Sequence, residues 1–405
     1  MTKSLSITLL NPHADDFTRT PLSFWLVRRR GLGKYAYLID EPIRQGEQVH
    51  VLVDGTLSSV LGQTLFNRLP RWLRAVILRI ELPAWILING LRNKVIVHWS
   101  PDTIADRKVL YVFSYKNCVG AFPGRKNLID QFDRKIINLS HYFIRTSEKA
   151  KNIVKLDNVI LTAESDLRHN AYFKNFFTTD QRLLVLPFAV GARFKAEKPF
   201  SKRAQICAAT GTFHNLYDEK PPEFYRDFIG FYRLDTYHPV RRLLYRQRDG
   251  IKDWLDNRIS LYREKSGRGD LVSRLMTALR LDVSQSEYFA FDIVDFYNDH
   301  KFAIVGEEVT GSPTIGFFEA MACGCAVLGQ EGTFYDGLGL KPGIHYLAHD
   351  GTLEGIKGTI DAVLAEPGRA EKISATGQAY IAQNATPAAV WAMLRRQLED
   401  LAAAS

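Results

Sequence analysis

Cysteine is scarce in this sequence, which has four among its 405 residues: Cys118, Cys207, Cys323 and Cys325. A single glycine separates Cys323 from Cys325, and no group of histidines accompanies them. Neither a disulfide framework nor a metal site is therefore expected. A chain that folds without disulfides suits a reducing compartment, so we expect a cytoplasmic protein.

Long apolar runs are missing as well. No stretch reaches the roughly 18 uncharged apolar residues that a membrane-spanning helix needs. The apolar run in residues 1–12 is too short for a secretory signal. Internal repeats and low-complexity segments are also absent. These absences exclude a membrane-spanning protein and a repeat protein.

What the chain does have is a large apolar content and an excess of positive charge. Hydrophobic residues make up 46% of it, which is enough to build two domains of ordinary size rather than a disordered chain. The net charge of +9 favours anionic partners. Nucleoside diphosphates, acidic lipid headgroups and nucleic acid are the three classes to consider.

One stretch, residues 300–329, has the order of a unit of a parallel α/β sheet. Residues 301–305 are a short apolar run typical of a buried strand, and 314–323 predict a helix that Gly324 ends. Residues 326–329 predict a second strand. The loop before the helix therefore lies at the carboxyl end of a strand, where open α/β sheets bind their ligands.

The start of this helix has the residues of an anion site. Ser312, Thr314 and Gly316 are small, so backbone N–H groups are accessible there, and the helix dipole adds partial positive charge. A diphosphate fits such a place. Glu319 follows about one turn later, where its carboxylate could accept hydrogen bonds from two ribose hydroxyls. The alternative is that Glu319 only completes a favourable first helical turn.

The sequence FFEAMACGCAVLG, at 317–329, resembles the donor-binding segment of GT-B glycosyltransferases, especially those with a family 4-like C-terminal domain. Residues 335–347 and 366–377 resemble the stretches that follow in that family, so the similarity covers 300–385. It implies an α/β protein with two Rossmann-like domains and a cleft between them. It also implies a nucleotide-sugar donor whose ribose Glu319 binds. The candidate donor-binding residues are Gly211, Thr212, Lys220, Ser312, Thr314, Ile315, Gly316 and Glu319.

Two positions depart from the family pattern. Retaining members carry a second glutamate eight positions before the first, and this chain has Gly311 there. The usual proline before the last strand is replaced by Ala326. Glu307 and Glu308 lie close enough in sequence to take the part of the missing carboxylate near the sugar; otherwise the enzyme is not of the retaining type.

The first half of the chain also alternates strands with helices. Residues 31–55 resemble the opening of GT-B enzymes, although Pro42 would disturb the expected helix at 35–44. The pair Gly31 and Gly33 lacks the third glycine of a dinucleotide fingerprint. Strands are expected at 5–10, 49–53, 95–99, 109–113, 142–145, 159–162 and 183–188.

A linker rich in lysine and proline, at 190–204, separates the two halves. The second half begins with a strand at 206–209. Gly211 and Thr212 follow it, where the family holds the donor phosphates, and Lys220 is a candidate basic residue unless it is simply solvated. The expected parts are an acceptor-side domain at 1–190, a nucleotide-sugar-binding domain at 205–385 and a last helix at 386–405 that packs back on the first domain.

The loop after the first strand contains His13, Asp15 and Asp16. A loop at the carboxyl end of a strand in the first domain can supply the base that takes the proton of an acceptor hydroxyl. Histidine has the proton affinity for this near neutral pH, and either aspartate could orient it. The alternative for each residue is loop capping or solvation.

Two basic regions stand outside these motifs. Residues 61–92 interleave arginines with apolar residues, which suits either a helix on an anionic membrane surface or a helix packed on its own domain with arginines facing solvent. Residues 215–290 are rich in arginine and tyrosine and fit the family poorly. An insertion with basic surface helices is preferred there over a nucleic-acid site, because no nucleic-acid motif accompanies it.

These patterns predict a cytoplasmic glycosyltransferase that moves a sugar from a nucleotide sugar to a glycan or lipid-linked acceptor in cell-surface polysaccharide or lipopolysaccharide synthesis. The membrane contact would be peripheral, on the inner face, through 61–92, and no nucleic-acid partner is expected. No metal or other cofactor is expected, since the family uses basic residues and helix dipoles at the diphosphate. A sugar-nucleotide epimerase on the same fold, and a transferase-like subunit that binds without catalysis, are the alternatives.

Overall fold

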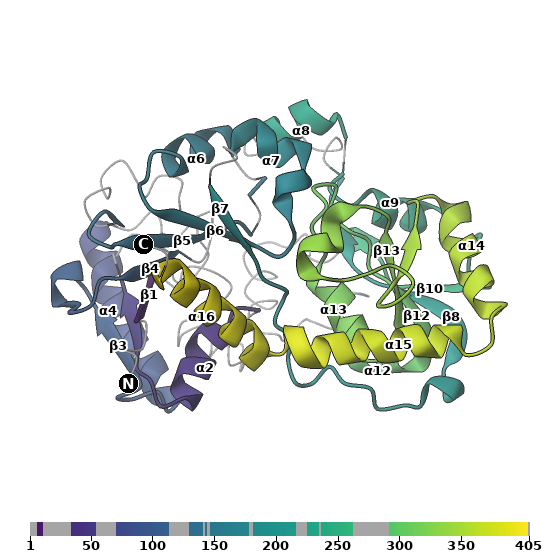
Figure 1. Cartoon of the computed structure of the whole chain (residues 1–405), viewed down its shortest axis with the longest axis horizontal. Helices are drawn as coiled ribbons and strands as arrows, with labels where there is room; N and C mark the ends of the chain where they lie inside the picture. The colour runs from purple at the N-terminus through teal and green to yellow at the C-terminus, as the bar shows by residue number, and fades with distance from the viewer. Residues whose placement is uncertain are drawn as a thin grey trace. The chain divides into compact units, whose positions relative to one another are not determined.

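The computed structural model describes residues 6–10, 34–53, 70–112, 129–140, 142–143, 146–177, 181–215, 225–234, 236–261 and 291–403. The chain divides into two compact units (Figure 1). Unit 1 comprises residues 1–163, 175–184 and 391–405, and unit 2 comprises 164–174 and 185–390. Each unit has its own parallel sheet, so the predicted two-domain α/β fold is confirmed.

The sheet of unit 1 has seven strands in the order β3-β2-β1-β4-β5-β6-β7. Its central strands are short runs of branched apolar residues that are buried on both faces, as parallel strands covered by helices require. The strands are β1 (Ile7–Leu10), β2 (Val49–Leu52), β3 (Val95–His98), β4 (Val109–Val112), β5 (Arg134–Asn138), β6 (Val159–Ala163) and β7 (Arg182–Val185). The order is that of a doubly wound Rossmann sheet.

The helices described in unit 1 are α2 (Tyr37–Arg44), α4 (Arg71–Ile88) and α6 (Thr146–Ile153), with the last residues of α7 (Ala171–Phe176) and most of α16 (Pro387–Ala403). Helix α2 continues through Pro42. From Trp391 onward α16 belongs to unit 1. Its Arg395 donates to the side-chain oxygens of Gln45 at 2.9 Å and Glu47 at 2.8 Å, which ties the end of the chain to the segment between α2 and β2.

One expected strand is wrong. Tyr142 and Phe143 lie in a turn, because the Tyr142 N–H donates to the Leu139 carbonyl at 2.9 Å and the Tyr142 carbonyl accepts from the Thr146 hydroxyl at 2.9 Å. The strand in this region is β5, which opens with Arg134 and Lys135 and so has a weaker apolar signal.

The sheet of unit 2 has the order β10-β8-β12-β13-β14. Its strands are β8 (Ala204–Ala209), β10 (Leu255–Asn257), β12 (His300–Ile304), β13 (Ala326–Gln330) and β14 (Leu347–His349), and β9 (Thr212–Phe213) pairs separately with β11 (Ser260–Leu261). All the paired strands are parallel. In chain order the sheet runs 2-1-3-4-5, so the strand order reverses between β8 and β12. This switch point is where such sheets bind ligands.

Two apolar clusters cover the faces of this sheet. Helices α12 (Ile293–Asp299) and α13 (Ile315–Ala322) pack on one face, and α9 (Pro239–Arg246) and α14 (Leu353–Leu364) on the other (Figure 1). Helix α15 (Arg369–Tyr380) contributes to both clusters, and α8 (Arg226–Tyr232) precedes α9. Helix α13 begins only after the loop that follows β12, which brings its first turn to the carboxyl edge of the sheet.

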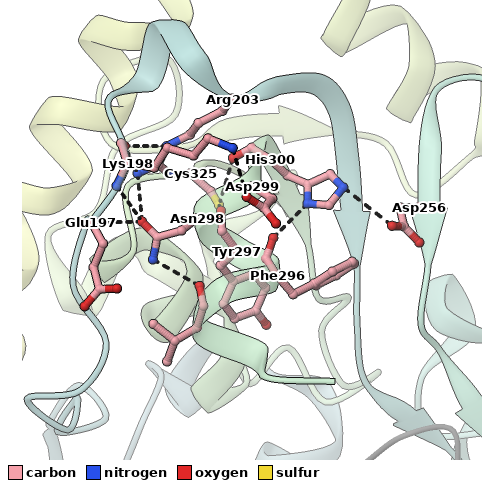
Figure 2. Close-up of polar contacts among 11 residues, drawn as sticks. Glu197, Lys198, Arg203, Asp256, Phe296, Tyr297, Asn298, Asp299, His300 and Cys325 are labelled. Atoms are coloured by element: carbon pink, nitrogen blue, oxygen red, sulfur yellow. Dashed lines mark hydrogen bonds and ion pairs between the residues drawn. The ribbon is translucent and has the colours of Figure 1, made fainter. Parts of the chain in front are cut away.

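The opposite edge of unit 2 has a buried polar network (Figure 2). The Asn298 side chain accepts from the backbone N–H groups of Glu197 and Lys198 at 2.7 and 3.3 Å. Buried Arg203 donates to the Lys198 carbonyl at 2.7 Å and to Asn298 at 3.2 Å. These bonds fasten residues 195–203, most of the expected linker, to the end of α12, so that stretch lies inside unit 2.

The cysteines described in unit 2 are buried free thiols. The Cys325 thiol donates to the Tyr297 carbonyl at 3.1 Å. Burial, with the negative charge of Glu319, raises the pKa of Cys323 to about 12. Burial likewise raises the pKa of Cys207 well above its usual value. These cysteines are therefore part of the core and stay protonated at neutral pH.

Candidate active site

The start of α13 has no side-chain cap. Thr314 is the N-cap residue in extended conformation, yet its side chain bonds to no helix N–H. Its buried hydroxyl oxygen has no hydrogen-bond partner among the described residues. The first N–H groups of a helix have no partner within the helix. An uncapped helix start beside an unpaired hydroxyl is therefore a place for an anion.

Gly316 lets this helix start approach the sheet. A Cβ at position 316 would lie 2.9 Å from a methyl carbon of Val305 and 3.3 Å from the Tyr297 hydroxyl. That hydroxyl lies 2.7 Å from the Thr210 hydroxyl at the end of β8. The helix start, the end of β12 and the end of β8 are thus packed together at the switch point.

Arg241, in the first turn of α9, crosses the same point. Its side chain is buried, and Nε donates to the carbonyl oxygens of Val305 at 2.6 Å and Gly306 at 3.2 Å. Nη1 donates to the Thr212 carbonyl at 2.8 Å. One guanidinium therefore joins the loop after β8 to the loop after β12. It places a permanent positive charge where the strand order reverses.

Gly211 makes room for that guanidinium. Its φ is +126°, and a Cβ there would lie 2.7 Å from Arg241 Nε. Glycine is required both by the backbone conformation and by the close approach. The predicted pair Gly211 and Thr212 thus lies at the switch point together with the predicted residues of the α13 start.

Glu319 lies one turn into α13 and is half-buried. Among the described residues no hydrogen bond or ion pair reaches its carboxylate. Burial raises the pKa of Glu319 to about 7, against an opposing influence from the positive charge of Arg193. A half-buried carboxylate that accepts no hydrogen bond lowers the stability of the protein. A ligand whose hydroxyl groups donate hydrogen bonds to Glu319 would remove that cost.

Glu307 has a different environment from Glu319. It is buried, and one carboxylate oxygen accepts from the Gln330 N–H at 2.9 Å and from the Tyr335 hydroxyl. Its other oxygen is buried without a partner among the described residues. Burial and the Glu307 charge raise the pKa of Tyr335 well above its usual value. Glu307 thereby ties the loop after β12 to the segment after β13.

Glu308 lies in the tight loop between β12 and α13. Its backbone N–H donates to the Ser312 carbonyl at 3.2 Å, and its carbonyl accepts from Gly311 at 2.8 Å. The Thr310 hydroxyl lies 3.4 Å from its carboxylate. The Ser312 hydroxyl lies 3.2 Å from that of Ser165, so the segment 164–174 also holds this loop.

Gly311 has no space for a side chain. Its φ is +79°, and a Cβ there would lie 2.0 Å from the ring of Phe334. The same ring lies 3.0 Å from where a Cβ of Gly332 would be. Phe334 thus lies against two glycines, one from each loop, and fills the position where retaining members of the resembled family carry a glutamate.

His13, Asp15, Asp16 and Lys220 lie outside the described residues, so their roles stay predictions. Arg241 was not singled out from the sequence, where it is one of several arginines in a region that fits the family poorly. The feature of the sequence that could have identified Arg241 is its position in the first turn of a helix. Among the described residues no group of histidine, cysteine or carboxylate side chains could hold a metal ion.

Comparisons with known proteins show which family the C-terminal region resembles. Residues 271–396 match the family model described as "Glycosyl transferase-like". No curated protein matches the chain. The predicted resemblance is confirmed for the C-terminal region, which contains β12, α13 and Glu319.

Three solved structures share the fold over almost their whole length. One is a sucrose-phosphate synthase from Thermosynechococcus elongatus, with a TM-score of 0.53 and 13% identity over 99% of this chain and 100% of that one. The second is HepE from Anabaena in complex with UDP and glucose, with a TM-score of 0.50 and 11% identity over 98% of this chain and 99% of that one. The third is a glycosyltransferase from Rickettsia africae, with a TM-score of 0.50 and 11% identity over 98% of this chain and 97% of that one. At these identities the likeness establishes the GT-B fold alone.

Proposed function

We propose that this chain is a glycosyltransferase that binds a nucleotide sugar at the carboxyl edge of the unit 2 sheet. The observation that carries the proposal is Glu319, a half-buried carboxylate with a raised pKa and no described partner, one turn behind an uncapped helix start. A nucleotide supplies what both features lack: ribose hydroxyls for the carboxylate and a diphosphate for the N–H groups.

The diphosphate would lie between the α13 start and Arg241. Cleavage of the bond between the sugar and the diphosphate leaves additional negative charge on the phosphate oxygens. The N–H groups at residues 314–316 and the guanidinium can stabilise that charge in a partly dry site. HepE binds UDP and glucose, so a UDP-sugar is the first donor to test.

The acceptor hydroxyl attacks the anomeric carbon of the sugar and loses its proton to a base. We propose the loop 11–16 as the source of this base, with His13 first and Asp15 or Asp16 next. A retaining reaction would need a carboxylate near the sugar. Position 311 has no space for one, and Glu307 is engaged by Tyr335 and Gln330, so Glu308 is the remaining candidate.

We expect the acceptor to be a glycan or a lipid-linked sugar used in cell-surface polysaccharide or lipopolysaccharide synthesis, handled on the cytoplasmic side of a membrane. An epimerase would change the nucleotide sugar without any acceptor. A non-catalytic binding subunit would bind it and change nothing.

A panel of nucleotide sugars tests these alternatives. Thermal shift identifies the donor, and product analysis with and without sugar acceptors identifies the reaction. Release of nucleoside diphosphate that depends on acceptor supports the proposal. An isomerised nucleotide sugar would indicate the epimerase, and binding without turnover with every acceptor would indicate the binding subunit.

A further inference from the structure

Helix α4 presents an apolar stripe to solvent. Of the eight exposed large hydrophobic side chains among the described residues, four lie on this one helix. They are Trp72 (67% exposed), Val76 (46%), Ile80 (68%) and Leu87 (66%). Helix geometry places the four within an arc of about 80° and along about 22 Å of the axis. We call these four residues the α4 stripe.

The opposite side of α4 packs on unit 1. Leu82 and Trp85 are each only 5% exposed, and both lie well away from the stripe on the helical wheel. The helix therefore has two apolar sides, and one of them is buried in the core of unit 1. The solvent face of α4 therefore contains these apolar side chains as well as the exposed Arg79. A contiguous exposed apolar stripe marks an interaction surface.

The charges around the stripe indicate the partner. Residues 68–94 contain six basic residues (Arg68, Arg71, Arg74, Arg79, Arg92 and Lys94) and one acidic residue, Glu81. Among them Arg79, Arg92 and Lys94 are exposed, and the Arg79 guanidinium lies 5.4 Å from the centre of the Trp99 ring. An apolar stripe with basic flanks and a tryptophan is the pattern of a helix that lies in an anionic lipid surface.

A second copy of the chain fits this surface less well. A two-fold interface would bring the same basic residues of both copies together, and like charges oppose each other there. No described helix is long and apolar enough to cross a membrane. We propose that the α4 stripe inserts into the headgroup region of an anionic lipid bilayer and holds unit 1 against it, with Arg79, Arg92 and Lys94 contacting the headgroups.

Sedimentation with phosphatidylcholine vesicles, with and without phosphatidylglycerol, tests the proposal on the full chain. The stripe variant Trp72→Ser/Ile80→Ser/Leu87→Ser should lower the partition coefficient about tenfold or more for each residue changed. The matched control Ile344→Ser/Leu364→Ser removes two exposed apolar side chains from unit 2 and should bind like wild type. If the triple variant fails to fold, Ile80→Ser alone should still lower the partition coefficient.

The same vesicle experiment also tests whether the basic residues contribute to binding and whether salt weakens it. The variant Arg79→Gln/Arg92→Gln/Lys94→Gln should weaken binding about fivefold for each charge and make the remainder less sensitive to salt. Wild-type binding without anionic lipid at equal strength, or unchanged binding of the stripe variant, would overturn the proposal. So would a wild-type dimer in solution that the stripe variant converts to monomers, because the occupant would then be a second copy.

Nucleotide binding is measured separately on each variant. The stripe is remote in sequence from every residue assigned to the donor, so donor affinity should be unchanged in the stripe and charge variants. A wild type that binds vesicles but no nucleotide would refute the proposed function and leave the lipid surface standing. A wild type that binds nucleotide but no vesicles would refute the lipid surface and leave the proposed function standing.

Discussion

Replacing Glu319 with glutamine should stabilise the protein and weaken nucleotide binding at the same time. Burial raises the pKa of Glu319 from 4.5 to about 7. Because one pKa unit corresponds to about 1.4 kcal/mol, the shift amounts to about 3 kcal/mol. The side chain is half-buried, so we take this figure as the largest effect to expect.

The sign follows from proton linkage. Between pH 4.5 and about 7 the folded protein binds the Glu319 proton more tightly than the unfolded chain does. The free energy of unfolding therefore falls as pH rises through that window and stays low above it. Glutamine has no proton to lose, so Glu319→Gln should match wild type at acidic pH. Above pH 7 it should be more stable by up to about 3 kcal/mol.

Thermal unfolding at several pH values measures this. For a unit of this size each kcal/mol corresponds to about 2–4 °C in Tm, so the gain at alkaline pH should reach several degrees. The matched control is Glu371→Gln, an exposed glutamate in the first turn of α15, which should change Tm little at any pH. If the variant is no more stable than wild type at alkaline pH, the charged Glu319 carboxylate does not destabilise the folded protein and the reasoning is refuted.

Nucleotide affinity gives the opposite sign. Loss of a charge-assisted hydrogen bond costs about 1.5–3 kcal/mol, so the Kd of a nucleoside diphosphate should rise about tenfold to a hundredfold in Glu319→Gln. Isothermal titration calorimetry measures it. An unchanged Kd would refute the ribose role, whatever the unfolding experiment shows.

Four further outcomes follow from the same geometry. Arg241→Lys keeps the charge but not the planar fork, so diphosphate affinity should fall while nucleoside affinity holds; equal losses for both ligands would indicate a purely structural arginine. Gly311→Ala should strongly destabilise the wild type, because the new side chain meets the Phe334 ring. In a Phe334→Ala background it should cost only about 1 kcal/mol, since only the penalty for the backbone conformation remains. Additive effects of the two substitutions on stability would contradict a clash between them. His13→Ala should lower turnover about 10²–10⁴-fold with donor binding intact, and near wild-type turnover would remove His13 as the base. Nucleotide-sugar affinity should fall as pH drops below about 7, because protonated Glu319 accepts hydrogen bonds less well, and a flat profile from pH 5 to 8 would count against the carboxylate.

The sequence predicted the unit 300–329 well because its signals are local. An apolar run, a loop with glycine, a helix and a terminal glycine succeed one another within thirty residues, and the observed β12, α13 and β13 follow them closely. The candidate donor-binding residues from Ser312 to Glu319 lie on that unit. Local patterning is enough to place such residues together at one sheet edge.

Features that depend on distant parts of the chain were not predictable in the same way. Arg241 reaches carbonyl groups 29 and 64 residues away in the sequence. Phe334 fills the space above Gly311 from the next loop along the sheet. Glu307 is one of two candidates for a carboxylate near the sugar, and its bonds to Gln330 and Tyr335 depend on how two loops pack. Spacing alone contains none of this information.

Hydrogen–deuterium exchange with and without a nucleoside diphosphate tests the central claim most directly, because it reports where the nucleotide binds. The account predicts slower exchange in peptides that contain residues 210–212, the start of α9 and the segment 306–319, and no such effect in Arg241→Gln at the same nucleotide concentration. Slower exchange confined to other segments of unit 2 or to unit 1, with residues 306–319 unchanged, would contradict it.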